Sequence, residues 1–565
     1  MAKPVIYQLI PRLFTNYCEN PLRNGTIMHN GSGKLNDITP HILSEIKKLG
    51  ATHVWYTGVI EHAHDADYTA YGIPRHNPHV IKGHAGSPYA ITDYYGIDPD
   101  LAVDVPNRIA EFEALIKRTH EAGLKVIMDF VPNHVARQYH SDAKPVGIRD
   151  LGQGDNVDMF FSPSNNFFYI TRQQFSPVDV DLGHGRNAYV EFPAKASGND
   201  CYTAYPGKND WYDTVKLNYG VDPWNGNHCF SPIPPTWFKM LHILRYWSAK
   251  GVDGFRCDMV HMVPLDFWHW AISNIKEKYP KMQFIAEIYD VSLYRPFIEV
   301  GGFDYLYDKV SLYDTLYGID RNNVSAANIT SCWQSVEGIN QNMLCFLENH
   351  DEVRYASPFF AGDAMKVEPS LVVTAMINRG AVMIYAGQEL GEDAHGEAGY
   401  SGDDGRTTIF DYWVIPTIQQ WLNHGECNGI LTAEQECLRA LYTRVLTLCN
   451  REKAISEGDF FDLMYVNYAN PSFNPHSLYA FMRHHGSTTI LIVANFSNME
   501  ADAEVNLPQL AFDMYDMAPG RYRGTDLLTG ESSTRNITWE RPVEVKIKPR
   551  SAMVWKFTHK KMSRS

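Results

Sequence analysis

Polar and charged side chains cluster at the ends of four short apolar runs in this sequence. They are Asp129, Asn133 and His134 at the first run, Arg256 and Asp258 at the second, Glu287 at the third, and Asn349, His350 and Asp351 at the fourth. A single acid in such a place is often part of a structural ion pair, but four runs that agree favour one shared site. Carboxyl groups brought together in this way can protonate a leaving oxygen and attack a carbon or activate water.

Other catalytic chemistries lack their usual motifs. No glycine-rich phosphate loop follows any of these runs, and the sequence contains neither an HExxH zinc motif nor a serine-centred elbow. Paired carboxylates without a metal-binding motif suit the cleavage of an acetal, the bond that joins two sugars. The residue types therefore indicate glycoside chemistry before any fold is considered.

Segments of helical periodicity alternate with the apolar runs. Three helices are predicted over 39–50, 107–123 and 236–251, and each ends in a glycine, the residue that most readily ends a helix. Thr39 can cap the first of them and Pro40 suits its first position. The apolar runs between helices are typical of strands covered on both faces, and hence of a parallel sheet.

Eight such runs, beginning with residues 5–14, predict an α/β fold with a (β/α)8 TIM barrel. Two stretches interrupt the alternation. Residues 135–222 contain no helix of useful length and are rich in Gly, Pro, Asn, Asp and Tyr, which indicates an inserted domain after strand three. After about residue 450 the apolar period becomes two, as in 543–547, which indicates an antiparallel β-sandwich.

The expected domains follow from these boundaries. The catalytic barrel comprises 1–134 and 223–450, the inserted domain comprises 135–222, and the C-terminal antiparallel β-sandwich comprises 451–565. Active sites of TIM barrels lie at the carboxyl ends of the strands. The acids, histidines and arginine named above are therefore expected to meet at one mouth of the barrel.

Composition narrows the class of ligand. The chain has 565 residues and a formal charge of −15, and its basic runs are limited to a short tail at 560–564, so we expect neither nucleic acid nor an anionic membrane as a partner. Aromatic residues make up 13%, with 33 Tyr and 12 Trp, and such rings fill large cores or hold sugars. The longest apolar stretch, 371–387, contains Asn378 and Arg379, which argues against a membrane span.

The cysteines and the N-terminus suggest a compartment. Nine cysteines are scattered with no CxxC pair, so neither a disulfide framework nor a structural zinc site is expected. The first residues, MAKPVIYQLIPRLF, lack the pattern of a signal peptide. We therefore expect a cytoplasmic protein; the sequence leaves its oligomeric state open.

Four motifs at the strand ends resemble the conserved blocks of the α-amylase family (glycoside hydrolase family 13). They read DFVPNH at 129–134, GFRCDMVHM at 254–262, FIAEIYD at 284–290 and FLENHDEVR at 346–354. Their order and spacing are similar too, and the resemblance covers barrel, inserted domain and β-sandwich. It implies a retaining hydrolase of starch-type α-glucans or malto-oligosaccharides.

The resemblance implies a role for each matching residue. Asp258 is the nucleophile, Glu287 the general acid and base, and Asp351 a third acid that holds and distorts the sugar. Implied substrate contacts are Tyr89, His134, Arg256, His350, Arg406 and His261. Tyr89 would be a stacking platform, Arg256 would keep Asp258 ionised, and His261 stands where many members have a lysine that contacts sugar beyond the cut.

Two departures from the family pattern affect the residues that would bind calcium. Many members bind Ca²⁺ through the Asn of the first block, an Asp of a fifth block and a His after the nucleophile. Here Asn133 remains, but the other two positions are Lys216 and Met262, which supply no oxygen ligand. We expect no cofactor at that site, and Lys216 to place its charge there instead. A separate Ca²⁺ site in the loop at 16–37 stays open.

Two alternatives remain beside hydrolysis. A transglycosylase of the same fold, such as a glucanotransferase or a trehalose-forming enzyme, would share the chemistry up to the glycosyl-enzyme. An inactive barrel that only binds sugar would lack one or more of the three carboxylates, and all three are present.

Overall fold

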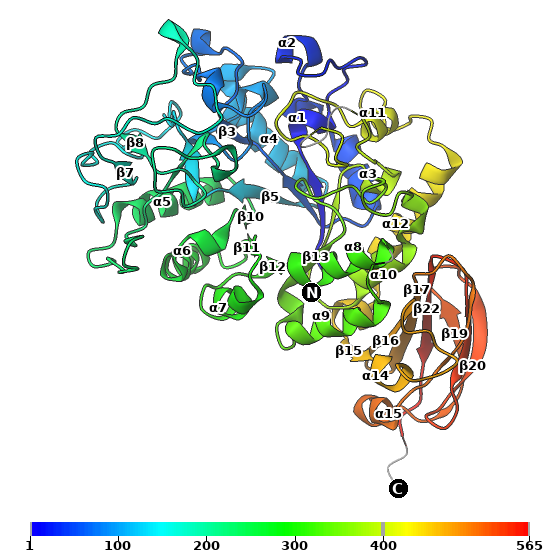
Figure 1. Ribbon diagram of the computed structural model, residues 1–565. Coiled ribbons are helices and arrows are strands. Elements are labelled where there is room, and N and C mark those ends of the chain that lie inside the picture. Colours follow the sequence, from blue (N-terminus) through cyan, green and yellow to red (C-terminus); the bar gives the residue numbers. More distant parts are fainter. Residues whose placement is uncertain (1–2, 322, 397–401, 563–565) are drawn as a thin grey trace.

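The computed structural model describes residues 3–321, 323–396 and 402–562. Its centre is a closed barrel of eight parallel strands, in the spatial order β1-β2-β5-β10-β11-β12-β13-β14 (Figure 1). These strands are β1 (Val5–Leu9), β2 (His53–Tyr56), β5 (Lys125–Phe130), β10 (Gly254–Cys257), β11 (Gln283–Ala286), β12 (Tyr305–Tyr307), β13 (Met343–Phe346) and β14 (Val382–Tyr385). The predicted (β/α)8 barrel is confirmed.

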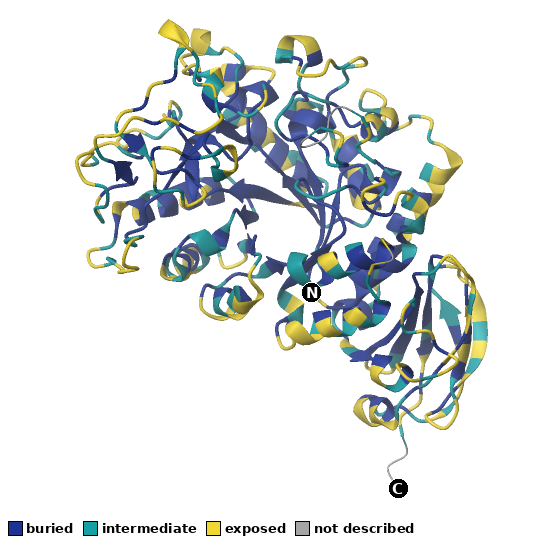
Figure 2. Cartoon of the chain, in the orientation of Figure 1, coloured by how far each residue is buried: buried dark blue, intermediate teal, exposed yellow. Residues whose placement is uncertain are grey.

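Nearly every residue of these strands is buried, which explains why they read as unbroken apolar runs (Figure 2). The first run was predicted over 5–14, but β1 ends at Leu9. Pro11 lacks the backbone N–H that a strand would need for its ladder and begins the short helix α1 (Pro11–Phe14) instead.

Helices surround the barrel. The longer ones are α3 (Pro40–Lys48), α4 (Arg108–Glu121), α5 (Pro235–Ala249), α6 (Leu265–Lys278), α10 (Glu368–Met376) and α12 (Ala433–Arg451). The shorter ones that follow later strands are α7 (Tyr294–Glu299), α8 (Asp314–Asp320), α9 (Ile329–Ser335) and α11 (Pro416–Leu422).

Helix α4 shows how these helices pack against the barrel, because Phe112, Leu115 and Ile116 form one buried stripe. At α3 the side chain of Thr39 accepts a hydrogen bond from the backbone of Ile42, as a cap should.

Two long excursions leave the carboxyl ends of the strands. The first, after β2, contains the antiparallel pair β3 (Ile60–His62) and β4 (Ile91–Ile97). The second, after β5, contains the pair β6 (His134–Ala136) and β9 (Thr214–Lys216) and the pair β7 (Tyr169–Ile170) and β8 (Ala194–Lys195), with only two single-turn helices between 135 and 222. Both excursions lie over the same side of the barrel (Figure 1).

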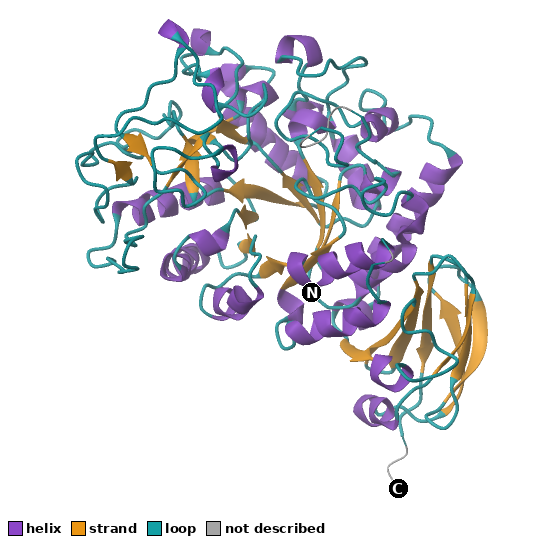
Figure 3. Ribbon diagram, in the orientation of Figure 1, coloured by secondary structure: helices purple, strands orange, loops and turns teal. Residues whose placement is uncertain are grey.

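The C-terminal part of the chain is antiparallel. Its larger sheet has the order β15-β16-β17-β22-β19-β20, and β18 pairs with β21 (Figure 3). The strands are β15 (Asp459–Asp462), β16 (Leu478–His485), β17 (Thr488–Asn495), β18 (Ala501–Val505), β19 (Gly520–Asp526), β20 (Ser532–Ile537), β21 (Val543–Ile547) and β22 (Ser551–Thr558).

Buried arginines join this sheet to the barrel. Arg483 donates to the backbone carbonyls of Ile377 and Ala454, and Arg550 pairs with Asp320 of α8 at 2.9 Å. Among the described residues, no helix combines the length and the apolar character that crossing a bilayer requires.

Candidate active site

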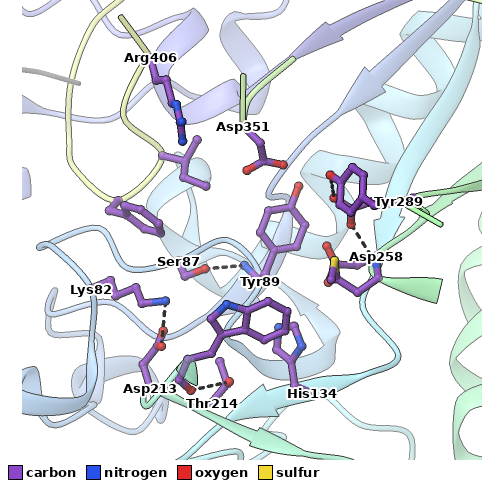
Figure 4. Close-up of a pocket in the computed structure, with 15 residues that line it drawn as sticks. Lys82, Ser87, Tyr89, His134, Asp213, Thr214, Asp258, Tyr289, Asp351 and Arg406 are labelled. Carbon is purple, nitrogen blue, oxygen red and sulfur yellow. Dashed lines mark hydrogen bonds and ion pairs between the residues drawn. The ribbon is translucent and has the colours of Figure 1, made fainter. Parts of the chain in front are cut away.

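A cavity of about 310 Å³ opens at the carboxyl ends of the barrel strands. Its wall includes all three acids expected from the sequence, Asp258, Glu287 and Asp351, which follow β10, β11 and β13. Tyr89, His134 and Arg406 also line it, and they come from the two excursions and the loop after β14 (Figure 4). Six of the nine predicted site residues therefore share one cavity.

Arg256 organises the carboxylates from behind the cavity wall. Its Nη1 lies 2.6 Å from Asp258 Oδ1 and its Nη2 lies 2.7 Å from Glu287 Oε2. The side chain is fully buried, and its Nε donates to the Tyr307 hydroxyl at 3.1 Å. Arg256 thus touches the acids rather than the cavity itself, and one buried cation fixes two of the three acids.

A further acid lies close to the same arginine nitrogen that contacts Asp258. Asp129 at the end of β5 accepts hydrogen bonds from Trp55 Nε1 and from the backbone N–H of Gly58, and its Oδ1 lies 3.8 Å from Arg256 Nη1. Asp129 does not line the cavity and is a structural partner of Arg256.

The residue after Asp258 has an unusual backbone. Met259 has φ +43°, in the left-handed region that a side chain disfavours. In this conformation its N–H donates to Glu287 Oε2 at 2.9 Å. The turn that follows β10 therefore helps to position the acid that follows β11.

Asp258 and Glu287 have different electrostatic surroundings. Burial raises the pKa of Glu287 to about 7; Arg256 counteracts this rise and the nearby Asp258 adds to it. Burial also raises the pKa of Asp258, but the Arg256 guanidinium opposes that shift both by its charge and by a hydrogen bond. Glu287 is therefore suited to carry a proton near neutral pH.

The pKa of Asp351 is shifted in the opposite direction, below its ordinary value. Burial raises its pKa, but the charges of His350 and Arg256 and a hydrogen bond from His350 outweigh burial and hold the pKa below its ordinary value. His350 Nε2 lies 3.0 Å from Asp351 Oδ2 and 2.5 Å from the Tyr89 hydroxyl. Like Arg256, His350 is buried behind the wall, stacked on the Tyr89 ring.

Tyr289 was not predicted from the sequence. It lines the cavity, and its hydroxyl donates to Glu287 Oε1 at 2.6 Å. A donor to the ionised carboxylate stabilises that form and so lowers the pKa of Glu287.

Replacing Tyr289 by Phe is therefore expected to move the basic limb of the pH profile. With Glu287 as the acid, kcat/KM should fall in the wild type as pH rises through about 7, where Glu287 loses its proton. Without the donor the pKa of Glu287 rises, so the limb should shift to higher pH. Profiles of both proteins on one substrate measure this, and coincident limbs would contradict the role of Tyr289.

Other lining residues were also missed. Lys82 and Asp213, from the two separate excursions, pair at 3.1 Å, and Trp211 lies 5.2 Å from the His134 ring, centroid to centroid (Figure 4). Asp213 is buried, so the pair joins the two excursions firmly. No local motif marks these residues, because the contact forms only when two distant loops close over the barrel.

His261 lies elsewhere. It lines a neighbouring cavity of about 420 Å³, together with Lys216, Asp200 and Met262. The structure therefore separates His261 from the three acids' cavity, although it follows Asp258 by only three residues.

Lys216 occupies the position where the family pattern would place a calcium ligand. It is 5% exposed and donates to Asn133 Oδ1, and to the Met262 carbonyl at 3.0 Å. Its Nζ also lies 2.6 Å from Asp200 Oδ1. The remaining oxygens thus face an ammonium group, and this set does not fit a Ca²⁺ ion.

Family models match two parts of the chain. The model "Alpha amylase, catalytic domain" matches residues 8–174, and the model "Alpha amylase, C-terminal all-beta domain" matches residues 468–558. The first begins within β1 and ends in the first half of the second excursion, and the second covers most of the C-terminal sheets.

Known proteins are similar over longer stretches. The α-amylase MalA of Haloarcula japonica is 24% identical over 357 residues, 62% of this chain and 40% of that protein. An α-glucosidase of Pediococcus pentosaceus is 26% identical over 444 residues, 69% of this chain and 66% of that protein. The chain thus spans from two fifths to about two thirds of the length of these relatives.

A solved structure has the same fold. The maltogenic α-amylase AmyB of Thermotoga neapolitana superposes with a TM-score of 0.64 at 19% identity, over 99% of each chain. At this identity the likeness concerns the fold.

Proposed function

Because this chain belongs to the α-amylase family, as the two matched domain models indicate, we propose that it cleaves α-1,4-glucosidic bonds of starch-type α-glucans or malto-oligosaccharides with retention of configuration. One observation carries the proposal: a single buried guanidinium contacts both Asp258 and Glu287 on the wall of one cavity. Carboxyl groups of retaining glycosidases lie about 5–5.5 Å apart, and a shared arginine suits such a short separation.

In the first step Asp258 attacks the anomeric carbon and Glu287 gives its proton to the leaving oxygen. The glycosidic C–O bond breaks as the ester bond to Asp258 forms, and the shortened glucan leaves as an alcohol. The raised pKa of Glu287 supports its role as the proton donor, and Arg256 supports Asp258 in the ionised form that attacks.

In the second step the ionised Glu287 takes a proton from water, which attacks the same carbon and displaces Asp258. Two inversions give net retention. Neutral sugar hydroxyls would be held by Asp351, His134 and Arg406, and the Tyr89 ring would face the sugar, because all four line the cavity beside the two reacting acids.

A transglycosylase is the alternative, in which a sugar hydroxyl replaces water in the second step. The second cavity, which His261 lines, favours keeping this alternative, because it offers a separate place for an acceptor sugar. Incubation with maltoheptaose, with and without excess maltose, separates the two by chromatography. Shorter products alone support hydrolysis, longer products support transfer, and an unchanged substrate would contradict both.

We further propose that Lys216 replaces calcium between the barrel and the second excursion. Its contacts with Asn133, Asp200 and the Met262 carbonyl support this, since they tie β9 to the loops after β5 and β10.

Ca²⁺ added to the EDTA-treated protein is accordingly expected to change activity less than twofold, whereas Lys216→Met should lower both the melting temperature and activity. The methionine is one atom shorter, unbranched and uncharged, so it leaves Asn133 Oδ1 without its buried donor, at a cost of about 1–3 kcal/mol. Differential scanning fluorimetry and starch assays measure both effects, and Lys208→Met at an exposed position is the matched control. Loss of activity in EDTA that only Ca²⁺ restores would contradict the proposal, as would an unchanged Lys216→Met protein.

A further inference from the structure

A second group of ligand-type side chains lies outside the three acids' cavity, between β3 and the end of β4. It comprises His62, His64 and His76 from the first excursion, and Asp98 and Asp100, which follow β4. All five are buried, and the sequence motifs of the active site include none of them. The group therefore needs its own explanation.

Three of these residues converge closely. One nitrogen of His64 and one carboxylate oxygen from each of Asp98 and Asp100 all lie within 4.8 Å of one another. His64 is 1% exposed, and both aspartates are 0% exposed. Two ligands at about 2.0–2.2 Å from a common ion lie at most about 4.4 Å apart, so a bound ion would draw these atoms slightly closer together.

Their polar atoms lack partners that a buried group requires. Among the described residues, neither ring nitrogen of His64 has a hydrogen-bond partner, and neither has Asp98 Oδ2 or His76 Nδ1. Each such atom left unsatisfied costs about 1–3 kcal/mol. His64 Nε2 faces Asp98 Oδ1 at 4.0 Å, too far for a hydrogen bond but suitable for two ligands of one ion.

His62 makes an unfavourable contact with the same group. Its Nδ1 lies 2.9 Å from the carbonyl of Ile60, an acceptor, so Nδ1 carries the proton. In the neutral ring Nε2 then has only a lone pair, yet it lies 3.2 Å from Asp98 Oδ2. A cation beside this oxygen would relieve the repulsion between the two lone pairs.

The aspartates are held from outside, as metal ligands usually are. The hydroxyls of Tyr68 and Tyr412 donate to the two oxygens of Asp100 at 2.8 and 2.7 Å, and the backbone N–H of Asp100 donates to Asp98 Oδ1 at 2.9 Å. Such outer hydrogen bonds orient ligating carboxylates and leave their remaining lone pairs directed inward. The surrounding structure thus fixes the carboxylates while His64 stays unsatisfied.

The negative charges of the two aspartates favour a bound cation over water alone. Ionised Asp98 and Asp100 would carry two negative charges in a buried space. Arg12 contacts His62 Nε2 at 3.1 Å and donates to the backbone carbonyls of Ala85 and Ile409, and Lys34 donates to the backbone carbonyl of Asp100. Neither donates to a carboxylate of the pair, and buried carboxylates are normally paired or bound to metal.

We propose that His64, Asp98 and Asp100 bind one divalent transition-metal ion of the Zn²⁺ class. An imidazole nitrogen with two carboxylates suits zinc and its neighbours in the first transition series, whereas Ca²⁺ and Mg²⁺ prefer oxygen ligands throughout. His62 and His76 flank His64, with ring centroids 6.4 and 5.9 Å away.

The position of the ion gives it a structural role. Residues 63–90 run from β3 to β4 and carry Lys82, Ser87 and Tyr89 of the three acids' cavity. An ion bound by His64, Asp98 and Asp100 would connect the start of this loop to the segment that follows β4. The ion would stabilise the wall of the substrate cavity without touching substrate.

A second acidic group, formed by both excursions, does not share these features. Glu61, Asp93 and Asp142 also approach one another, but Arg108 lies 3.1 Å from Glu61 and 2.7 Å from Asp142. Asp93 accepts from Ser141 and from the backbone of Tyr95 and Ala143. An arginine already neutralises this group, so the metal is assigned to the His64 group alone.

The test measures binding rather than activity, so its result is independent of the proposed hydrolysis. The full chain is stripped with EDTA, dialysed, loaded with Zn²⁺, passed through a desalting column and assayed for zinc by mass spectrometry. We expect one zinc per chain for the wild type and for His485→Gln, an exposed control at the end of β16, and less than one tenth of that for His64→Gln. Co²⁺ should give a visible absorption band that His64→Gln lacks.

Asp98→Asn is a second variant in case His64→Gln does not fold, and it should lose zinc in the same way. The melting temperature of the stripped wild type should rise when Zn²⁺ is added, because an ion that binds only the folded chain stabilises it. A wild type that retains no zinc, or variants at both positions that retain as much as the wild type, would overturn the proposal.

Discussion

Asp258→Asn is expected to lower kcat on maltoheptaose by a factor on the order of 10⁴ while the protein stays folded. The amide cannot act as the nucleophile, so the ester intermediate is not formed. Asp258 is buried at the end of β10 with Arg256 as its main partner, and the amide oxygen of Asn can still accept from that guanidinium. The loss should therefore appear in the chemical step rather than in folding.

Steady-state kinetics measure the effect, and circular dichroism with a melting curve verifies the fold. Asp290→Asn is a matched control. This exposed acid lies in the loop after β11, at the same end of the barrel, but it does not line the cavity. Turnover of Asp258→Asn within tenfold of the wild type would contradict the assignment of the nucleophile.

Glu287→Gln is expected to be nearly as inactive on starch, with a loss on the order of 10³-fold, but much less impaired on an activated aryl α-glucoside. The acid contributes about 10²–10⁴-fold when the leaving group is a sugar oxygen, which departs poorly without a proton. An aryl oxide departs without one, so its first step does not need Glu287. The neutral amide keeps the size of the side chain that Tyr289 and Met259 contact.

Comparing the two substrates isolates the role of the proton. Added azide should restore turnover of the aryl substrate, because the anion attacks the ester without needing a base. Equal losses on starch and on the aryl glucoside, with no response to azide, would be incompatible with Glu287 as the acid and base.

The sequence predicted the barrel well because its signals are local. Thr39, Pro40 and Gly50 delimit the first long helix, and apolar runs buried on both faces mark parallel strands. The meeting of Asp258, Glu287 and Asp351 also followed from sequence, since carboxyl ends of parallel strands share one face. The error at β1 came from reading an apolar run past Pro11.

The side chains around these acids were harder to foresee. Arg256, within β10, and His350, in the loop after β13, proved to be buried behind the wall. The pair of Lys82 with Asp213 depends on how two excursions fold over the barrel, which no periodicity encodes. The group around His64 escaped notice for the same reason, since its residues have no fixed spacing along the chain.

One measurement tests the central claim most directly: NMR of the first product released from maltoheptaose, recorded before mutarotation. Net retention by Asp258 and Glu287 requires the α anomer to appear first and the β anomer to grow only at the rate of mutarotation. The account predicts that order. A β anomer released first would show a single displacement by water and would contradict a mechanism in which Asp258 forms an ester.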